Sequence, residues 1–208
     1  RVWRKVLTRK QRTESKNKLL YQDLGLAFRI LRDFVGSEID RVRVDSNLSF
    51  KELSEFSVEF IPELSSKIEH YKGASPIFDL FDAENEVQRA LERKVPLKSG
   101  GYLIIDQTEA MTTVDINTGA FVGHRNLEET IFNTNVEATL AIARQLRLRN
   151  LGGIIILDFI DMKSADHRRR VFNSLEQALA KDRVKTNIND FSPLGLIEMT
   201  RKRTHESL

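Results

Sequence analysis

The sequence predicts an α/β protein built around a mixed sheet. Apolar runs of strand length alternate with longer segments in which apolar residues recur at helical spacing. The run "GGIIILDFI" (152–160) is rich in β-branched residues, as is typical of a buried strand. Two further strands are predicted at 101–106 and 109–117, close enough along the chain to form a hairpin.

The N-terminal half predicts shorter elements. A helix is expected within 19–35, because Leu20, Leu24, Phe28 and Leu31 have helical spacing and Gly36 follows. Residues 1–19 are expected to be weakly structured or to depend on sequence outside the chain. The remaining expectations are a strand at 39–45, a helix at 50–60, a strand at 65–73 and a helix at 82–94. A domain junction is predicted near residues 90–100.

Two long helices are predicted in the C-terminal half. Asn126 and Glu129 have the capping-box spacing at the start of a helix that runs to about Arg149. Its expected buried stripe consists of Leu127, Ile131, Ala138, Ile142 and Leu146. A second helix is expected over 164–182, with Val171, Leu175 and Leu179 facing inward, followed by strands at 183–188 and 194–202.

Composition narrows the functional classes. The 208 residues are 40% hydrophobic and 30% charged, with a net charge of +3 and no cysteine. Disulfides and thiolate zinc sites within these residues are therefore excluded. No apolar run approaches the roughly 18 residues of a membrane span. No secretory signal is seen, and the absence of an initiating methionine indicates an excised fragment. Clustered basic segments such as "ARQLRLRN" suit a polyanion, although solvated helix faces explain them equally well.

Polar residues at strand ends are the candidate site. Asp115 and Asn117 lie two residues apart in a strand and therefore share one face, and Asp158 ends another strand. If these strands are neighbours, Asp115 and Asp158 meet at one edge, where two carboxylates favour a cation such as Mg²⁺. Turn formation or helix capping remains an alternative, and Asp161 remains a competing acid. There is no P-loop, GxGxxG or HExxH motif.

A long resemblance adds to this reading. The segment "GGYLIIDQTEAMTTVDINTGAFVGHRNLEETIFNTNVEATLAIARQLRLRNLGGIIILDFIDM" closely resembles the catalytic domain of the bacterial ribonuclease E/G family, and its ribonuclease G members more than its ribonuclease E members. The resemblance continues through "HRRRVFNSLEQALAKDRVKT" and "GLIEMTRKR", and reaches back to "SSKIEHY" and "PIFDLF". It covers nearly the whole chain and is strongest from Ser99 to Arg203.

The resemblance implies a fold and a catalytic site. It implies a DNase I-like catalytic domain with a mixed sheet at 93–208, a small RNase H-like α/β subdomain at 39–92, and a basic tail and helix from a sensor region at 1–38. Asp115, Asn117 and Asp158 match the catalytic residues, with Asp115 and Asp158 holding Mg²⁺, for which Mn²⁺ is a substitute. Asp161 is left with a structural role.

The resemblance also implies partners. It predicts cleavage of single-stranded RNA, preferably 5′-monophosphorylated, in rRNA processing and mRNA decay in the cytoplasm, with 5′-phosphate and 3′-hydroxyl products. The full-length protein is expected to be at least a dimer, without membrane contact, and zinc is expected only through residues outside the chain. The fragment alone is expected to be weakly active or inactive. Candidate RNA contacts are His124, Arg144, Arg147, Arg149, Arg169 and Lys185, the last as a candidate 5′-phosphate sensor.

Two other functions remain open from the sequence. One is a different Mg²⁺-dependent phosphodiesterase on the same scaffold, since fold analogy alone does not define a substrate. The other is a non-catalytic RNA-binding module whose carboxylates are structural. RNA cleavage that depends on Mg²⁺ distinguishes the main prediction from both.

Overall fold

The computed structural model describes residues 24–34, 39–119, 127–204 and 207. It divides into two compact units, Arg1–Phe81 and Asp82–Leu208. The division falls inside the segment 39–92 that the sequence analysis assigned to one subdomain, and the RNase H-like interpretation of that segment stays a prediction. None of the helices in the described ranges is long and apolar enough to cross a membrane.

The first unit is a small α/β layer. Its two strands, β1 (Val42–Val44) and β2 (Ile68–His70), pair in parallel. The helices among its described residues are α2 (Leu26–Phe34), α3 (Asn47–Phe60), α4 (Pro62–Ser65) and α5 (Ile77–Leu80). The strands predicted at 39–45 and 65–73 are confirmed with shorter bounds, and the helix predicted at 50–60 begins earlier, at Asn47. The helix predicted within 19–35 is confirmed over Leu26–Phe34, and its residues 19–23 lie outside the described residues. Leu31, Leu53, Leu64 and Ile68 form its buried core.

The second unit contains a six-stranded mixed sheet in the order β3-β4-β5-β6-β8-β7. The strands are β3 (Lys94–Pro96), β4 (Tyr102–Gln107), β5 (Met111–Asn117), β6 (Gly153–Asp158), β7 (Thr186–Ile188) and β8 (Leu196–Arg201). Only β5 and β6 pair in parallel, while the other neighbours are antiparallel. The predicted α/β class, mixed sheet and hairpin are confirmed.

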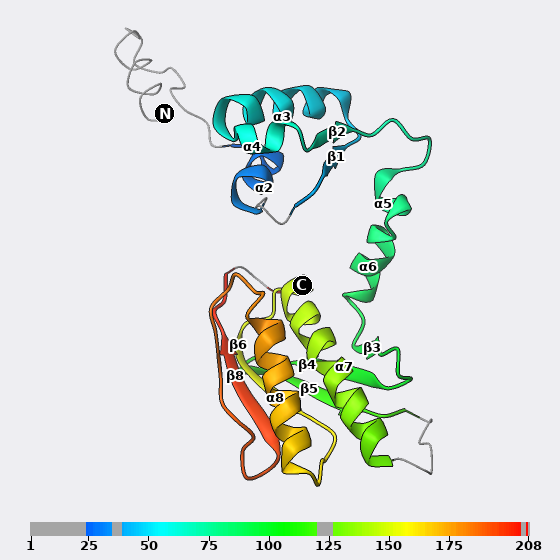
Figure 1. Cartoon of the computed structure of the whole chain (residues 1–208), viewed down its shortest axis with the longest axis vertical. Coiled ribbons are helices and arrows are strands. Elements are labelled where there is room, and N and C mark those ends of the chain that lie inside the picture. Colours follow the sequence, from blue (N-terminus) through cyan, green and yellow to red (C-terminus); the bar gives the residue numbers. More distant parts are fainter. Residues whose placement is uncertain (1–23, 35–38, 120–126, 205–206, 208) are drawn as a thin grey trace, which may run out of the picture. The chain divides into compact units, whose positions relative to one another are not determined.

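Two long helices cover one face of this sheet (Figure 1). They are α7 (Leu127–Leu148), which connects β5 to β6, and α8 (Ala165–Leu179), which follows β6. Ser164 caps α8 by accepting a hydrogen bond from the backbone N–H of His167. The short helix α6 (Ala83–Arg89) precedes β3.

Alternation along the strands separates the two faces of the sheet. Leu103, Val114, Leu157 and Ile197 are all 1% exposed or less and pack in the core beneath the helices. Residues at the intervening positions, such as Ile154, are partly or fully exposed. The sheet therefore has one face buried under α7 and α8 and one face open in this chain.

Two sequence expectations are wrong. The helix predicted over 82–94 ends at Arg89, and its last residue, Lys94, instead begins the edge strand β3. Leu127 was expected in the buried stripe of α7 but is 48% exposed, because the first turn of α7 lies at the end of the packed layer. The rest of the stripe is confirmed as buried or packed against the core.

Candidate metal centre

The parallel strands β5 and β6 bring two carboxylates together. Asp115 and Asp158 are direct partners in the β5–β6 register. Both are exposed, whereas the preceding residues Val114 and Leu157 are buried under the helices. The carboxylates therefore lie on the open face, towards the carboxyl ends of two parallel strands, where ligands of α/β sheets are commonly bound.

Asn117 belongs to the same cluster. It lies two residues after Asp115 and on the same face of β5. Its side-chain Nδ2 donates a 2.9 Å hydrogen bond to Oδ2 of Asp115. The amide thus orients one carboxylate and leaves lone pairs on both oxygens of Asp115 available to a further ligand.

The charges of this cluster favour a cation. Burial raises the pKa of Asp158, and the negative charges of Asp115 and Asp161 raise it further. A divalent cation would relieve this repulsion, and two carboxylates are a common protein donor set for Mg²⁺. Within the described ranges no group of three or more His, Asp, Glu or Cys residues is arranged to hold a metal. The donor set therefore fits an ion that keeps water molecules in its remaining positions.

Helix α7 supports the β6 side of the cluster through Asn135. The Asn135 side chain is fully buried, donates to the backbone oxygen of Ile160 at 2.8 Å and accepts from the backbone N–H of Ile160 at 3.1 Å. Both hydrogen-bonding ends of the amide are used, so Asn135 fixes the chain that follows Asp158. Sequence reasoning missed this residue, although it lies four residues after Ile131 in the buried stripe.

Helix α7 also supports the β5 side through Glu137. Its carboxylate accepts hydrogen bonds from the backbone N–H groups of Lys98 and Ser99. Partial burial disfavours ionisation of Glu137, but these hydrogen bonds outweigh it and hold its pKa below the usual range. The turn that they anchor packs against the end of β5, where a β-carbon added at Gly101 would lie 2.6 Å from the carbonyl oxygen of Asn117.

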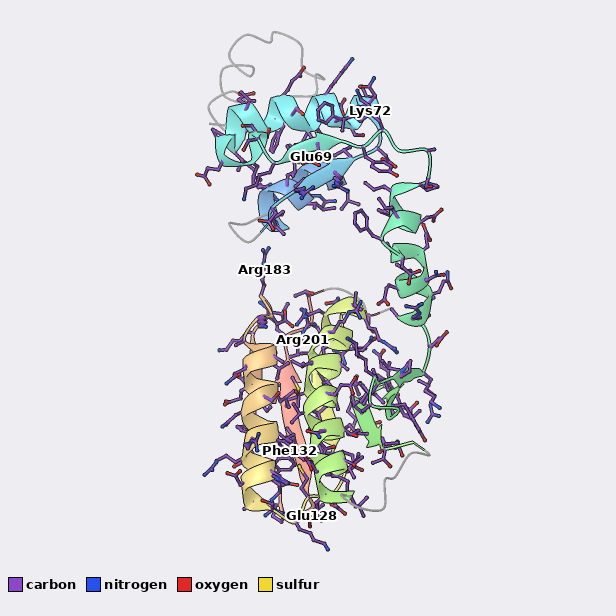
Figure 2. The ribbon with its side chains drawn as sticks, turned by 45° about the vertical axis from the view of Figure 1, so that its right-hand side comes forward. Glu69, Lys72, Glu128, Phe132, Arg183 and Arg201 are labelled. Atoms are coloured by element: carbon purple, nitrogen blue, oxygen red, sulfur yellow. The ribbon has the colours of Figure 1, made fainter. Side chains whose placement is uncertain are left out.

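A small pocket opens at the same end of the sheet, between the first turns of α7 and α8. Leu127, Glu128 and Ile131 line it from α7, and the segment 161–163 and His167 line it from the other side. Phe132 stacks on His167 with ring centroids 4.5 Å apart. Figure 2 shows Phe132 between the two helices and Glu128 at the start of α7.

The predicted arginines of α7 lie away from the carboxylates, near the opposite end of the helix. Arg144 forms an ion pair with Glu86 at 2.6 Å. Arg149 is only 6% exposed, and its Nε donates to Gln145 at 2.7 Å. This burial is unfavourable for the predicted RNA contact of Arg149, which stays a prediction. Arg147 lies near enough to Asp182 to affect its ionisation.

The other predicted RNA contacts are divided between the two ends of the sheet. Arg169 is exposed in the first turns of α8, on the Asp158 side, and pairs with Asp166. Lys185 precedes β7 and accepts a backbone hydrogen bond from Lys202. Thr186 pairs with Arg201, five residues along β8 from the partner of Asp158, or about 17 Å away. His124 lies outside the described residues.

Comparison with known proteins places this α/β chain in a family. Residues 1–204 match the Ribonuclease E/G family, and the chain belongs to that family. It is 73% identical to Ribonuclease G of Escherichia coli (strain K12) and 72% identical to Ribonuclease G of Salmonella typhimurium (strain SL1344), in both cases over all 208 residues. It is 42% identical to Ribonuclease E of Escherichia coli (strain K12) over 192 residues, or 91% of the chain. The chain spans 42% of each Ribonuclease G and 18% of that Ribonuclease E.

Proposed function

We propose that the chain carries the catalytic centre of a metal-dependent endoribonuclease that cuts single-stranded RNA. The observation that carries the proposal is the direct register pairing of Asp115 and Asp158, with Asn117 hydrogen-bonded to Asp115. The names of the relatives, Ribonuclease G and Ribonuclease E, supply the substrate class. The products proposed are a 5′-phosphate and a 3′-hydroxyl, in rRNA processing and mRNA decay in the cytoplasm.

Each residue of the cluster has a proposed role. Asp115 and Asp158 hold Mg²⁺, or Mn²⁺ in its place, and Asn117 orients Asp115. When bound, such an ion neutralises charge on the phosphate and makes water a better nucleophile. Asn135 and Glu137 keep the two strand ends in place, so that the carboxylates do not have to reorganise when substrate binds.

The wider architecture follows the same proposal. Residues 93–208 form a DNase I-like catalytic domain, a proposal supported by a sheet that helices cover on one face (Figure 1) and that exposes Asp115 and Asp158 on the other. The segment 39–92 is an RNase H-like subdomain. The full-length protein is at least a dimer, and zinc is bound only by residues outside these 208, which contain no cysteine.

A preference for 5′-monophosphorylated RNA is proposed to involve Lys185. The residue is exposed and lies at the opposite end of the sheet from Asp158. A cation at that distance suits the recognition of a chain end rather than of the bond cut. Lysine would bind such a phosphate as a point charge. Replacing Lys185 by Ala should reduce the advantage of 5′-phosphate over 5′-hydroxyl substrates and leave cleavage of 5′-hydroxyl RNA unchanged.

The direct test uses the full-length protein. It is incubated with a 5′-monophosphorylated single-stranded RNA and with single-stranded DNA, each with Mg²⁺ or with EDTA, and the product ends are mapped. We expect cutting of RNA with Mg²⁺ only. Asp115→Asn and Asp158→Asn should each reduce the rate by several orders of magnitude, whereas Asp166→Asn, an exposed acid of α8, should not.

The outcomes separate the alternatives. Equal cutting of DNA would indicate a broader phosphodiesterase. RNA binding without Mg²⁺-dependent cutting would indicate a binding module, and full activity of either Asn variant would place the metal site elsewhere.

A further inference from the structure

An aromatic side chain lies beside the candidate metal centre on the open face of the sheet. Tyr102 of β4 is the direct register partner of Asn117. It is a diagonal neighbour of Asp115, a relation that separates α-carbons by about 7–8 Å and is within reach of aromatic side chains. Tyr102 is half-buried, and the next residue, Leu103, is fully buried on the opposite face. Tyr102 therefore lies on the face of Asn117 and Asp115 and not on the core face.

A lysine covers this ring. The Nζ of Lys94, from the edge strand β3, lies 3.9 Å from the centroid of the Tyr102 ring. Lys94 is exposed, and it lies in the same row of the sheet as Asp115, with Ile104 between them. This contact is worth only about 0.5–1 kcal/mol at an exposed site. A ligand that binds the Tyr102 ring with a comparable interaction energy can therefore displace the Lys94 ammonium group.

Single-stranded RNA has the chemistry that matches this pair. Bases stack on exposed aromatic rings with little dependence on sequence, and lysines neutralise the backbone phosphates. The flexible stem of Lys94 lets the ammonium move from the ring to a phosphate when a base takes its place. The neighbouring Asp115 carboxylate is otherwise unfavourable for a polyanion, so a nearby cation is needed to hold the strand at this point.

We propose that Tyr102 and Lys94 form a nucleotide subsite next to the metal centre. Tyr102 stacks on a base adjacent to the bond that is cut, and Lys94 binds a phosphate of the same strand. This inference rests on the proposed function, because it takes RNA as the ligand. It adds a determinant of substrate affinity outside the metal ligands.

The test measures RNA binding separately from cleavage. The full-length protein carries Asp158→Asn to prevent cutting, and its affinity for a fluorescent single-stranded RNA is measured in EDTA. A series of RNAs has one abasic site at each successive position. We expect one position to weaken binding about tenfold, within the range for loss of one stacked base. With Tyr102→Ala added, binding should weaken by a similar factor, and the abasic site at that position should have no further effect.

Matched variants distinguish stacking and charge from other roles. Tyr102→Phe should bind as tightly as the parent protein. Lys94→Gln should weaken binding and lower the slope of log K against log salt by about 0.7, the value for one phosphate of a single strand. Phe78→Ala, an exposed aromatic residue of the first unit, and Lys181→Gln, an exposed lysine beyond α8, should change neither quantity.

Three results would overturn the subsite: unchanged binding by Tyr102→Ala, an abasic penalty that persists in that variant, or equal loss in Tyr102→Phe. Unchanged binding by Tyr102→Ala would instead indicate that this edge of the sheet contacts another protein segment. Failure of the proposed function is distinct, since it would appear as absent Mg²⁺-dependent cleavage by the protein without substitutions, whatever the binding results.

Discussion

The pKa of Asp158 is raised, so replacing this residue tests the repulsion between the carboxylates of Asp115 and Asp158. Burial and the charges of Asp115 and Asp161 disfavour its ionised form. Replacing Asp158 by Asn removes one charge and keeps the shape of the side chain. We expect the free energy of unfolding in EDTA to stay the same or rise, by no more than about 1 kcal/mol because the site is exposed.

The effect of Mg²⁺ or Mn²⁺ on the melting temperature of Asp158→Asn should change more than its stability in EDTA. Under the proposed function, Mg²⁺ or Mn²⁺ is expected to bind the folded state, and it should then raise the melting temperature of the unsubstituted protein. Asp158→Asn should lose most of this rise, while the control Asp166→Asn keeps it. Thermal denaturation with and without the ion measures both effects. A rise of equal size in Asp158→Asn would show that the ion binds at another site.

Asn135 contacts the backbone of Ile160 and would act on the proposed metal centre only through that backbone. Asn135→Ala removes the partner of both the N–H and the carbonyl of Ile160. We expect a loss of about 2 kcal/mol in the free energy of unfolding, as for buried polar groups left unpaired. The Mg²⁺-dependent rise in melting temperature should also shrink. Asn187→Ala, at an exposed residue of the same sheet, is the control for urea denaturation. A stable variant with an unchanged cation response would remove Asn135 from a positioning role.

The turn between β3 and β4 should be sensitive at Gly101. A methyl group there would collide with the carbonyl oxygen of Asn117, which is backbone and cannot rotate away. Gly101→Ala should therefore destabilise the protein by about 1–3 kcal/mol, the usual cost of overpacking. It should also weaken the cation response, because the end of β5 must shift. Gly25→Ala is the matched control, since its added carbon would meet only Phe28 at an ordinary 3.7 Å. The midpoints of urea denaturation measure the loss of stability in each variant. An equal midpoint for Gly101→Ala and the unsubstituted protein would contradict the predicted collision.

A buried ion pair joins the segment that follows α8 to β8. Arg201 donates to Asp182 at 2.8 Å, and both side chains are less than 5% exposed. Burial disfavours the charged carboxylate, but Arg201 and the N–H of Val184 outweigh it and lower the pKa of Asp182. A lowered folded-state pKa means that the stabilisation is present above the unfolded-state pKa. It is lost as the pH falls through the folded-state value.

Removing the Asp182 charge should therefore change the pH profile of stability. At pH 7, Asp182→Asn leaves the Arg201 charge buried without its partner and should cost about 3–5 kcal/mol. The variant should also lose less stability than the unsubstituted protein between pH 7 and strongly acidic pH. Urea denaturation across this range measures both. Asp106→Asn, which breaks the solvent-exposed pair with Arg93, is the control. Arg93 also lowers the pKa of Asp106, but solvent screens this pair, so the variant should change the pH profile much less than Asp182→Asn.

The sequence predicted best those helices and strands in which apolar residues recur at regular spacing over many positions. The hairpin of β4 and β5, the core of α7 and the inward residues of α8 all have a repeating pattern over many positions. β3 was missed because it is three residues long, lies at an edge and has Lys94 and Pro96 exposed. Its single buried residue, Val95, gives no period to detect.

The candidate site was predictable only in part for a similar reason. Strand alternation placed Asp115 and Asn117 on one face, but the pairing of Asp115 with Asp158 depends on strand order, which no local pattern contains. The burial of Arg149 also depends on what packs against the end of α7. Tyr102 and Lys94 come together only through the register of β3 with β4. These contacts are tertiary, so residue type and spacing do not fix them.

At the scale of the whole chain, the two units have separate buried cores. The larger cluster draws all of its members from residues 95–199, and the smaller one consists of Leu31, Leu53, Leu64 and Ile68. Neither cluster includes a residue of the other unit. Within the described residues of the first unit this cluster has four buried side chains and supplies little stabilisation, since small domains bury a smaller fraction of their surface. The first unit should therefore be the less stable of the two.

This arrangement predicts local rather than global unfolding. Leu53→Ala should cost about 2–5 kcal/mol, the usual range for a buried leucine, which approaches the whole stability of so small a core. Amide hydrogen exchange should then become fast in β1, β2 and α3, while β5 and β6 keep their protection. Leu175→Ala, in the larger core, should have the reverse distribution. If Leu53→Ala accelerated exchange in β5 and β6 by the same factor, the two units would unfold as one. The metal centre would then depend on the core of the first unit.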